Sequence, residues 1–374
     1  MMTHTKLHTL ADAGQSVWLD YIQRSLITSG GLQAYIDKGL RGVTSNPSLF
    51  EEAIADSHDY DEQIQSLALQ EKSAQEIYEE LTVEDARIAA DVLRPVFDET
   101  DGADGFFSLE VNPHLAPDRQ ATIHEAARLF ALVDRPNVMI KVPATTEGVT
   151  AFQELIEEGV NINVTLMFSL AQYDAIAEAY IAAMEKRAEN VYNLKQIASV
   201  ASIFVSRLDT KVDKMLEAFV TPKAEALKGQ IGIANAKMAY QHYKEYFQSD
   251  RWQRLAEKGA RAQRVLYGST GTKNPNYPDV MYVENLIGRN TVNTIPPKTL
   301  EAFLDHGNIA LTLEQGLDEA REQLNSLPEL GINLDDVTQE LLDEGVENFA
   351  KPYDSLLKTI DEKKTALVNT ISFK

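Results

Sequence analysis

Eight short apolar segments alternate with helical segments along most of this 374-residue chain, and this alternation restricts the fold more than any other feature. Repeated strand–helix units imply parallel strands joined by crossover helices. Eight such units predict an α/β fold in which the strands close into a (β/α)8 TIM barrel. The expected strands are residues 17–21, 42–46, 106–111, 137–142, 160–168, 197–207, 264–268 and 290–295.

An open, doubly wound sheet is the alternative arrangement of the same units. Such a sheet usually has a glycine-rich turn after its first strand, whereas the first strand here is followed by the glycine-free sequence IQRS. After Pro296 and Pro297 the strand pattern stops, and the rest of the chain is helical and acidic in character. We therefore expect a catalytic barrel over residues 1–297 and a helical C-terminal extension over residues 298–374, packed on the barrel.

Local signals predict several element boundaries. Thr82 and Asp85 have the spacing of a capping box, Ser169 is a suitable N-cap, and residues 210–219 have a helical pattern. The acidic run at 98–105 lacks the carboxylate spacing of a calcium loop. We interpret this run as a surface loop.

Composition and charge exclude several functional classes. The chain has no cysteine, which rules out disulfides, thiolate zinc sites and thiol nucleophiles. Its seven histidines show no metal-binding spacing, so we expect neither a metal nor a cofactor. A formal charge of −22 disfavours nucleic acid and anionic lipid as partners. Any phosphate site must be a local cluster of donors and cations.

The sequence also lacks targeting and membrane signals. Its N-terminal residues contain no apolar core of signal-peptide length. Apolar runs elsewhere are far shorter than the roughly 18 residues of a membrane span. We expect a soluble, cytoplasmic protein, and the sequence leaves open whether it is a monomer or a homodimer.

Polar side chains within apolar strands point to a catalytic centre. Strand residues alternate sides, so Val138, Ile140 and Val142 are expected to face the outer helices, while Met139 and Lys141 face the barrel lumen. Burial of an amine favours its neutral, nucleophilic form, which suits imine formation with a carbonyl. The alternatives are a structural ion pair and an amine that reaches the solvent at the barrel mouth.

Neighbouring strands repeat the pattern. Asn163 and Thr165 are expected to face the lumen while residues such as Leu166 face outward, and Glu110 is expected to face inward from the third strand. Asp20 and Asn46 lie near the ends of the first two strands. Each residue alone has a structural explanation, but five neighbouring strands with inward polar groups suit Schiff-base aldol chemistry, which needs no metal.

A phosphate-binding turn is expected after the seventh strand. The sequence GSTGTKN at 268–274 fails the spacing of a P-loop, so ATP is not an expected ligand. Backbone N–H groups and Lys273 could still hold a phosphate. A solvated loop charge is the alternative role for Lys273, and an ion pair with Asp209 is the alternative for Arg207.

Six segments, in order over roughly residues 15–300, resemble the motifs of the transaldolase family. They read VWLD at 17–20, GVTSNPSLF at 42–50, SLEVNP at 108–113, IKVPATTEG at 140–148, VNINVTLMFSLAQY at 160–173 and SIFVSRLD at 202–209. The chain departs from common family patterns at Thr146, Ile203 and Lys273, where many members have tryptophan, proline and arginine.

The resemblance implies a role for each matched residue. Lys141 would form the Schiff base, Asp20 would be the general acid and base, and Glu110 would help to hold the catalytic water. Thr165 belongs to the catalytic set. The implied substrate-binding residues are Asn46, Asn163, Ser202, Phe204, Arg207 and, as the second phosphate ligand, Lys273.

The implied activity is that of a transferase of the pentose phosphate pathway. It would convert sedoheptulose 7-phosphate and glyceraldehyde 3-phosphate into erythrose 4-phosphate and fructose 6-phosphate by moving a dihydroxyacetone unit. Two alternatives stay open. One is an aldolase that releases dihydroxyacetone from fructose 6-phosphate, and the other is a non-enzymatic barrel that binds sugar phosphates.

Overall fold

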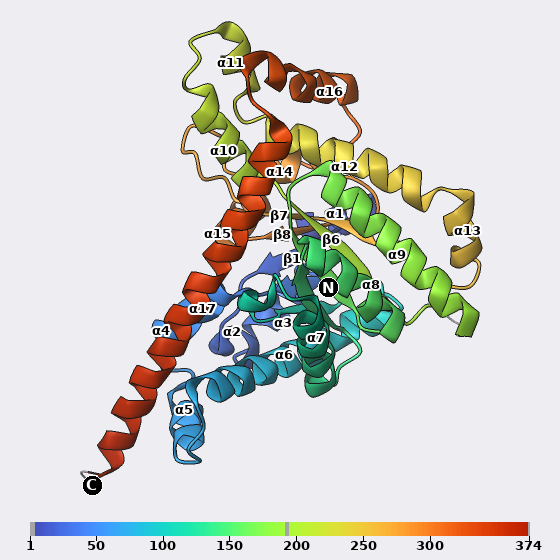
Figure 1. Ribbon diagram of the computed structural model, residues 1–374. Helices are drawn as coiled ribbons and strands as arrows, with labels where there is room; N and C mark the ends of the chain where they lie inside the picture. Colours follow the sequence, from blue (N-terminus) through green and yellow to red (C-terminus); the bar gives the residue numbers. More distant parts are fainter. Residues whose placement is uncertain (1–3, 191–193, 373–374) are drawn as a thin grey trace.

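The computed structural model describes residues 4–190 and 194–372. Its eight parallel strands close into a barrel in chain order, with the first strand paired to the last (Figure 1). All eight overlap the predicted strand segments, so the barrel prediction is confirmed. The strands are β1 (Gln15–Asp20), β2 (Gly42–Thr44), β3 (Phe106–Glu110), β4 (Val138–Pro143), β5 (Ile162–Met167), β6 (Ser199–Phe204), β7 (Arg264–Gly268) and β8 (Thr291–Ile295).

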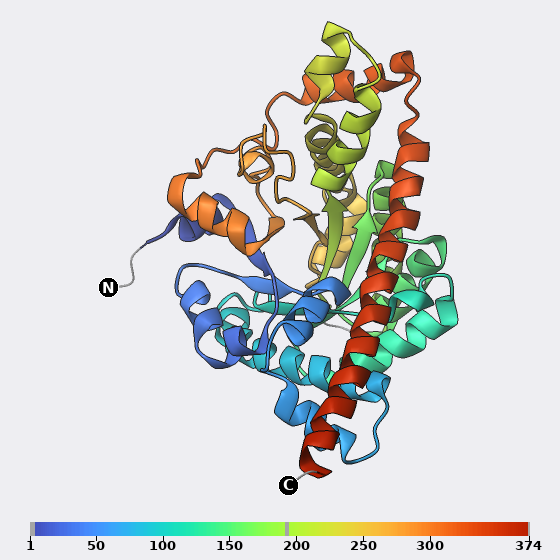
Figure 2. The ribbon, with the colours of Figure 1, turned by 90° about the vertical axis from the view of Figure 1, so that its left-hand side faces the viewer.

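Helices surround the barrel and continue beyond it (Figures 1 and 2). Those of the barrel region are α1 (Lys6–Ala13), α2 (Arg24–Thr28), α3 (Gly31–Ile36), α4 (Pro47–Ala55), α5 (Asp61–Ala68), α6 (Ala74–Glu99), α7 (Arg119–Val133), α8 (Thr146–Glu158), α9 (Leu170–Asn190), α10 (Ser206–Leu216), α11 (Pro222–Leu227), α12 (Ile231–Phe247), α13 (Asp250–Ala256) and α14 (Met281–Glu284), with the short 3-10 helix η1 (Pro113–Leu115). They are followed by α15 (Pro297–His306), α16 (Leu317–Ser326), η2 (Leu327–Leu330) and α17 (Leu334–Ser372). None of the described helices has the length and apolar character that crossing a membrane requires.

Alternation along the strands separates two cores. The outward side chains of β4, Val138, Ile140 and Val142, belong to the large cluster between strands and helices. The barrel interior has its own apolar layer, formed by Trp18, Phe106, Met139, Val200, Leu266 and Val292. This layer fills the barrel interior below the carboxyl ends of the strands, and the carboxyl end is where barrel enzymes hold their active sites.

The acidic run at 98–105 departs from the predicted surface loop at Asp104. This side chain is buried beneath the barrel, where it accepts hydrogen bonds from Ser16 Oγ at 2.7 Å and from Trp18 Nε1 at 3.3 Å. It also pairs with Arg264 at 2.9 Å. The surface-loop interpretation was therefore wrong for Asp104, because this buried carboxylate accepts from three side chains of strands β1 and β7.

Two predicted boundaries were wrong. Thr82 and Asp85 lie inside α6, whose capping box is formed more than two turns earlier by Ser73 and Glu76. Strand β6 ends at Phe204 rather than Arg207, and α10 begins at Ser206 rather than residue 210. Arg207 consequently lies in the first turn of a helix, where the N–H groups of Ser206, Leu208 and Asp209 already donate to backbone oxygens. Ser169 does cap the start of α9, where its Oγ accepts a hydrogen bond from Gln172 N at 3.1 Å.

Leu166 does not face the outer helices as predicted. The pairing between β5 and β6 shifts between Val164 and Met167, and Leu166 has a φ of +57°. This irregularity turns its side chain toward the mouth of the barrel, where it packs with Phe168 and Phe204. A bulge of this kind redirects a side chain at the rim of a barrel.

The C-terminal helices have different partners. Helix α15 packs on β1 and α1, as the eighth crossover helix of a barrel would, and α16 packs on α12. Helix α17 runs past one side of the barrel and contacts α4, α5, α6, η1, α10 and β5 (Figures 1 and 2). The division into a barrel up to residue 297 and an extension from residue 298 stays a prediction.

Candidate active site

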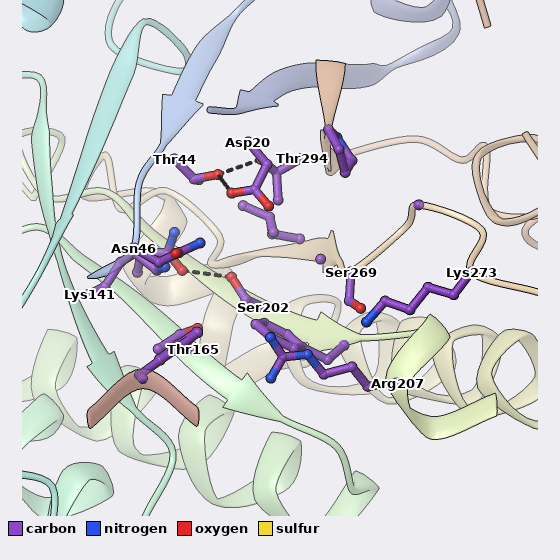
Figure 3. A pocket seen from close by; sticks show the side chains of 17 residues that line it. Asp20, Thr44, Asn46, Lys141, Thr165, Ser202, Arg207, Ser269, Lys273 and Thr294 are labelled. Carbon is purple, nitrogen blue, oxygen red and sulfur yellow. Dashed lines mark hydrogen bonds between the residues drawn. The ribbon is translucent and has the colours of Figure 1, made fainter. Parts of the chain in front are cut away.

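A cavity of about 190 Å³ opens at the carboxyl ends of the strands. Nine of the ten predicted site residues line it (Figure 3), and the tenth, Glu110, contacts the lining residue Lys141. The lining residues are Asp20, Thr44, Asn46, Lys141, Asn163, Thr165, Ser202, Phe204, Arg207, Leu266, Gly268, Ser269, Gly271, Lys273, Thr294, Pro296 and Phe349. Side chains from seven strands and α17 therefore meet in a single space.

Strand register brings the polar groups to the same height. Glu110 of β3 lies beside Lys141 of β4, and Lys141 lies beside Asn163 of β5. Asp20 of β1 is the neighbour of Thr44 on β2. A shift of one residue in any of these pairings would turn the side chains to the outer core.

Lys141 is buried among acceptors. Its Nζ donates to Glu110 Oε2 at 2.9 Å and to the backbone oxygen of Ser45 at 2.9 Å. Burial raises the pKa of the Glu110 carboxyl, although the charge of Lys141 acts in the opposite direction. Glu110 therefore contacts the amine directly and, when deprotonated, is placed to take a proton from it.

A second carboxylate lies across the cavity. Burial raises the pKa of Asp20, although the charge of Lys141 and a hydrogen bond from Thr44 act in the opposite direction. Thr44 Oγ1 donates to Asp20 Oδ1 at 2.9 Å and lies 2.6 Å from Thr294 Oγ1. This hydroxyl pair fixes the orientation of the Asp20 carboxylate, which is placed to exchange a proton with a substrate hydroxyl.

Amide and hydroxyl groups complete the floor of the cavity. Ser202 Oγ donates to Asn163 Oδ1 at 2.6 Å, and Asn163 Nδ2 donates to Ser108 Oγ at 3.2 Å. Thr165 Oγ1 is buried and has no hydrogen-bond partner among the described residues. An unsatisfied buried hydroxyl costs about 1–3 kcal/mol, so Thr165 is suited to bind a substrate hydroxyl or a water. Asn46 caps α4 by accepting from Leu49 N at 3.1 Å.

Two cations mark the other end of the cavity. Arg207 reaches it from the first turn of α10. Lys273 reaches it from the loop after β7, with its amine directed toward Ser269 (Figure 3). Desolvation and the nearby charge of Arg207 lower the pKa of Lys273. Neither cation has a carboxylate within ion-pair distance in the described ranges 4–190 and 194–372. Asp209 instead accepts from the backbone N–H of Gly232 at 2.6 Å, so the alternative of an Arg207–Asp209 ion pair is wrong.

The cavity includes residues that the sequence interpretation did not identify as site residues. Thr44 and Thr294 form the hydroxyl pair beside Asp20, and Thr294 follows the inward Val292 by two positions, a signal that strand alternation offered. Phe349 comes from the middle of α17 and contacts the cavity through tertiary packing alone. No local pattern in an amphipathic acidic helix distinguishes such a residue from an ordinary core residue.

Comparison with known proteins agrees with this geometry. The sequence profile of the family described as Transaldolase/Fructose-6-phosphate aldolase matches residues 17–360. A transaldolase of Trichodesmium erythraeum is 46% identical over 97% of this chain and 98% of the relative. A protein named transaldolase 2 of Streptomyces avermitilis is 47% identical over 95% and 96%, and a transaldolase of Thiobacillus denitrificans is 47% identical over 93% and 97%.

Proposed function

The chain belongs to the transaldolase/fructose-6-phosphate aldolase family, and from this membership we infer that it is a transaldolase. As such it is a transferase of the pentose phosphate pathway that forms a Schiff base and needs no metal. It moves a dihydroxyacetone unit from sedoheptulose 7-phosphate to glyceraldehyde 3-phosphate, which gives erythrose 4-phosphate and fructose 6-phosphate. Phosphorylated sugars are its substrates, and we propose that it works in the cytoplasm.

We propose Lys141 as the residue that forms the Schiff base. The observation that carries this proposal is a buried amine with one carboxylate contact, in a cavity that a second carboxylate enters from the opposite side. Glu110 accepts the proton of the ammonium, and the neutral nitrogen then attacks the ketone carbon C2 of the donor sugar. Loss of water from the carbinolamine gives the imine, with Thr165 and Glu110 holding that water.

Bond cleavage requires a base at the C4 hydroxyl, and we assign this role to Asp20. As it removes the hydroxyl proton, the C3–C4 bond breaks, the aldehyde leaves, and the electron pair moves into the imine to give an enamine. In the reverse sense, C3 of the enamine attacks the aldehyde carbon of the acceptor, and Asp20 returns the proton to the new hydroxyl oxygen. Hydrolysis of the imine then frees Lys141.

The remaining lining residues position the sugar. Asn46, Asn163 and Ser202 offer amide and hydroxyl groups to the donor hydroxyls, and Phe204 forms part of the apolar wall. Arg207 and Lys273 bind the phosphate. The Asp20 carboxylate and the names of the relatives favour transfer over the aldolase alternative, and the acid–base set around a buried amine argues against a barrel that only binds sugar phosphates.

Covalent trapping tests the proposed chemistry. Incubation with fructose 6-phosphate followed by borohydride reduction should convert the imine into a stable secondary amine on Lys141. Peptide mass spectrometry locates the adduct, and a reaction without fructose 6-phosphate is the control. An adduct on a different lysine, or none, would contradict the proposed function.

Removal of Arg207 or Lys273 should lower kcat/KM for phosphorylated substrates only. Arg207 offers two parallel donors and Lys273 a point charge, so Arg207→Ala and Lys273→Ala should each lose about 1.5–3 kcal/mol of transition-state binding, the scale of a charged hydrogen bond. The measurement is the ratio of kcat/KM for fructose 6-phosphate to kcat/KM for fructose. The loss should appear in that ratio because the carbonyl end of the cavity is unchanged.

Lys214→Ala is the matched control, since it removes an exposed cation from the same helix as Arg207 without touching the cavity. Its ratio should equal that of the parent. An unchanged ratio in Lys273→Ala would remove Lys273 from the phosphate site, and unchanged ratios in both cavity variants would leave the phosphate to backbone N–H groups.

A further inference from the structure

We infer that Phe349, on the C-terminal helix α17, is a specificity-determining residue that protects the covalent three-carbon intermediate from release between the departure of one aldehyde and the arrival of the next. The inference rests on the proposed function and assigns a catalytic consequence to the helix that extends beyond the barrel. It concerns the partition between transfer and hydrolysis.

The ring of Phe349 lies between the two functional ends of the cavity. Its centroid is 5.7 Å from Lys141 Nζ and 5.6 Å from Arg207 Cζ. The residue is only 3% exposed, so the ring faces the cavity and not the solvent. When the aldehyde phosphate leaves, the space beside Arg207 is vacated, while the three-carbon unit remains on Lys141. The ring of Phe349 then lies between the vacated space beside Arg207 and the three-carbon unit on Lys141.

Helix α17 is held so that Phe349 reaches this position. Gly345, one turn earlier, faces Leu166, and a Cβ on Gly345 would lie 2.9 Å from Leu166 Cδ2. The absence of a side chain therefore lets α17 approach the irregular end of β5. Lys211 of α10 also pairs with Glu344 at 2.6 Å and with Glu340 at 3.0 Å. The helix that carries Phe349 is thus fixed to two elements of the cavity.

Release of the intermediate needs water, whereas transfer does not. For release, the enamine carbon C3 first takes a proton, which regenerates the imine. A water oxygen then adds to C2, the C2–N bond breaks, and both protons of that water go to the nitrogen, which leaves free dihydroxyacetone and the Lys141 ammonium. For transfer, C3 attacks an aldehyde carbon instead. An apolar ring that limits the approach of bulk water slows the first route without opposing the second.

The test compares both routes in variants of α17. Free dihydroxyacetone released from fructose 6-phosphate alone measures hydrolysis, and sedoheptulose 7-phosphate formed after addition of erythrose 4-phosphate measures transfer. Phe349→Ala should raise the ratio of release to transfer by about tenfold. Phe349→Val keeps an apolar contact with the helix surroundings but removes the ring, and it should raise the ratio by a smaller factor.

Leu356→Ala is the matched control, because Leu356 is fully buried on the same helix but does not line the cavity. It should lower the melting temperature and leave the ratio unchanged. If Phe349→Ala has the same ratio of release to transfer as the parent, the inference is overturned. If the alanine variant does not fold, the ratio of Phe349→Val is the deciding measurement. Failure of the proposed function has a different signature, since the parent itself would then form neither a trapped adduct nor the transfer product.

Discussion

Lys141→Arg should fold like the parent and lose activity by on the order of 10⁴-fold or more, because a guanidinium stays protonated and cannot form an imine. Arginine keeps the positive charge that Glu110 faces, so the buried carboxylate retains a partner. Steady-state transfer rates give the activity, and thermal melting reports whether the fold is intact. The borohydride-trapped adduct should be absent.

Lys141→Met separates the chemical role from the structural one. It should be equally inactive, but it leaves Glu110 buried without its cation, which costs about 3–5 kcal/mol of unfolding free energy. The two variants should therefore share a rate defect and differ in melting temperature. Substantial residual activity in Lys141→Arg would show that the imine forms elsewhere.

Asp20→Asn should stop the reaction after imine formation. The amide keeps an oxygen that accepts from Thr44, so the cavity retains its shape, but the group no longer removes the C4 hydroxyl proton. Loss of a general base lowers the rate by about 10²–10⁴-fold. Mass spectrometry of the reduced adduct should find the whole six-carbon sugar on Lys141, whereas the parent also accumulates the three-carbon unit.

The pH profile offers an independent check on Asp20. Its carboxylate is the active form, and burial raises its pKa above the usual range. Parental activity should therefore be complete above this raised pKa and fall as the pH decreases through it, and Asp20→Asn should lack that limb. Thr44→Val removes a hydrogen bond that lowers the same pKa, so it should move the limb to higher pH. If Asp20→Asn turns over like the parent, the base lies elsewhere.

The sequence allowed the fold to be predicted because the signal was local and repeated. The apolar pattern of each segment predicted a strand, and eight strand–helix units restricted the topology to a closed barrel. The inward direction of Lys141 followed from strand alternation alone, because β4 is regular. Alternation misled where β5 is irregular, since the shift between Val164 and Met167 redirects Leu166. A bulge depends on the neighbouring strand and leaves no mark in the pattern.

Local signals also had limits in the helices and loops. A capping box is recognised by the spacing of two residue types. Thr82 and Asp85 have that spacing but lie within α6, where Asp85 pairs with Arg24 at 2.7 Å. The local sequence predicts that Asp104 is exposed like the other acidic residues of its run. Its carboxylate nevertheless accepts from side chains on two strands that are distant in sequence. Burial of a charged group is decided by partners that a local pattern does not contain.

The amino-acid sequence by itself determined the barrel and most of the polar residues around its mouth, because strand periodicity fixes which side chains share a face. Tertiary structure alone decided how those residues interact. The register of β3 and β4 placed Glu110 in contact with Lys141. The first turn of α10 placed Arg207 near Lys273. The packing of α17 placed the ring of Phe349 close to both Lys141 and Arg207. These contacts join residues as much as 208 positions apart, as with Lys141 and Phe349. Such contacts arise only when the chain closes on itself, since no local propensity encodes the distance between two segments that meet in space.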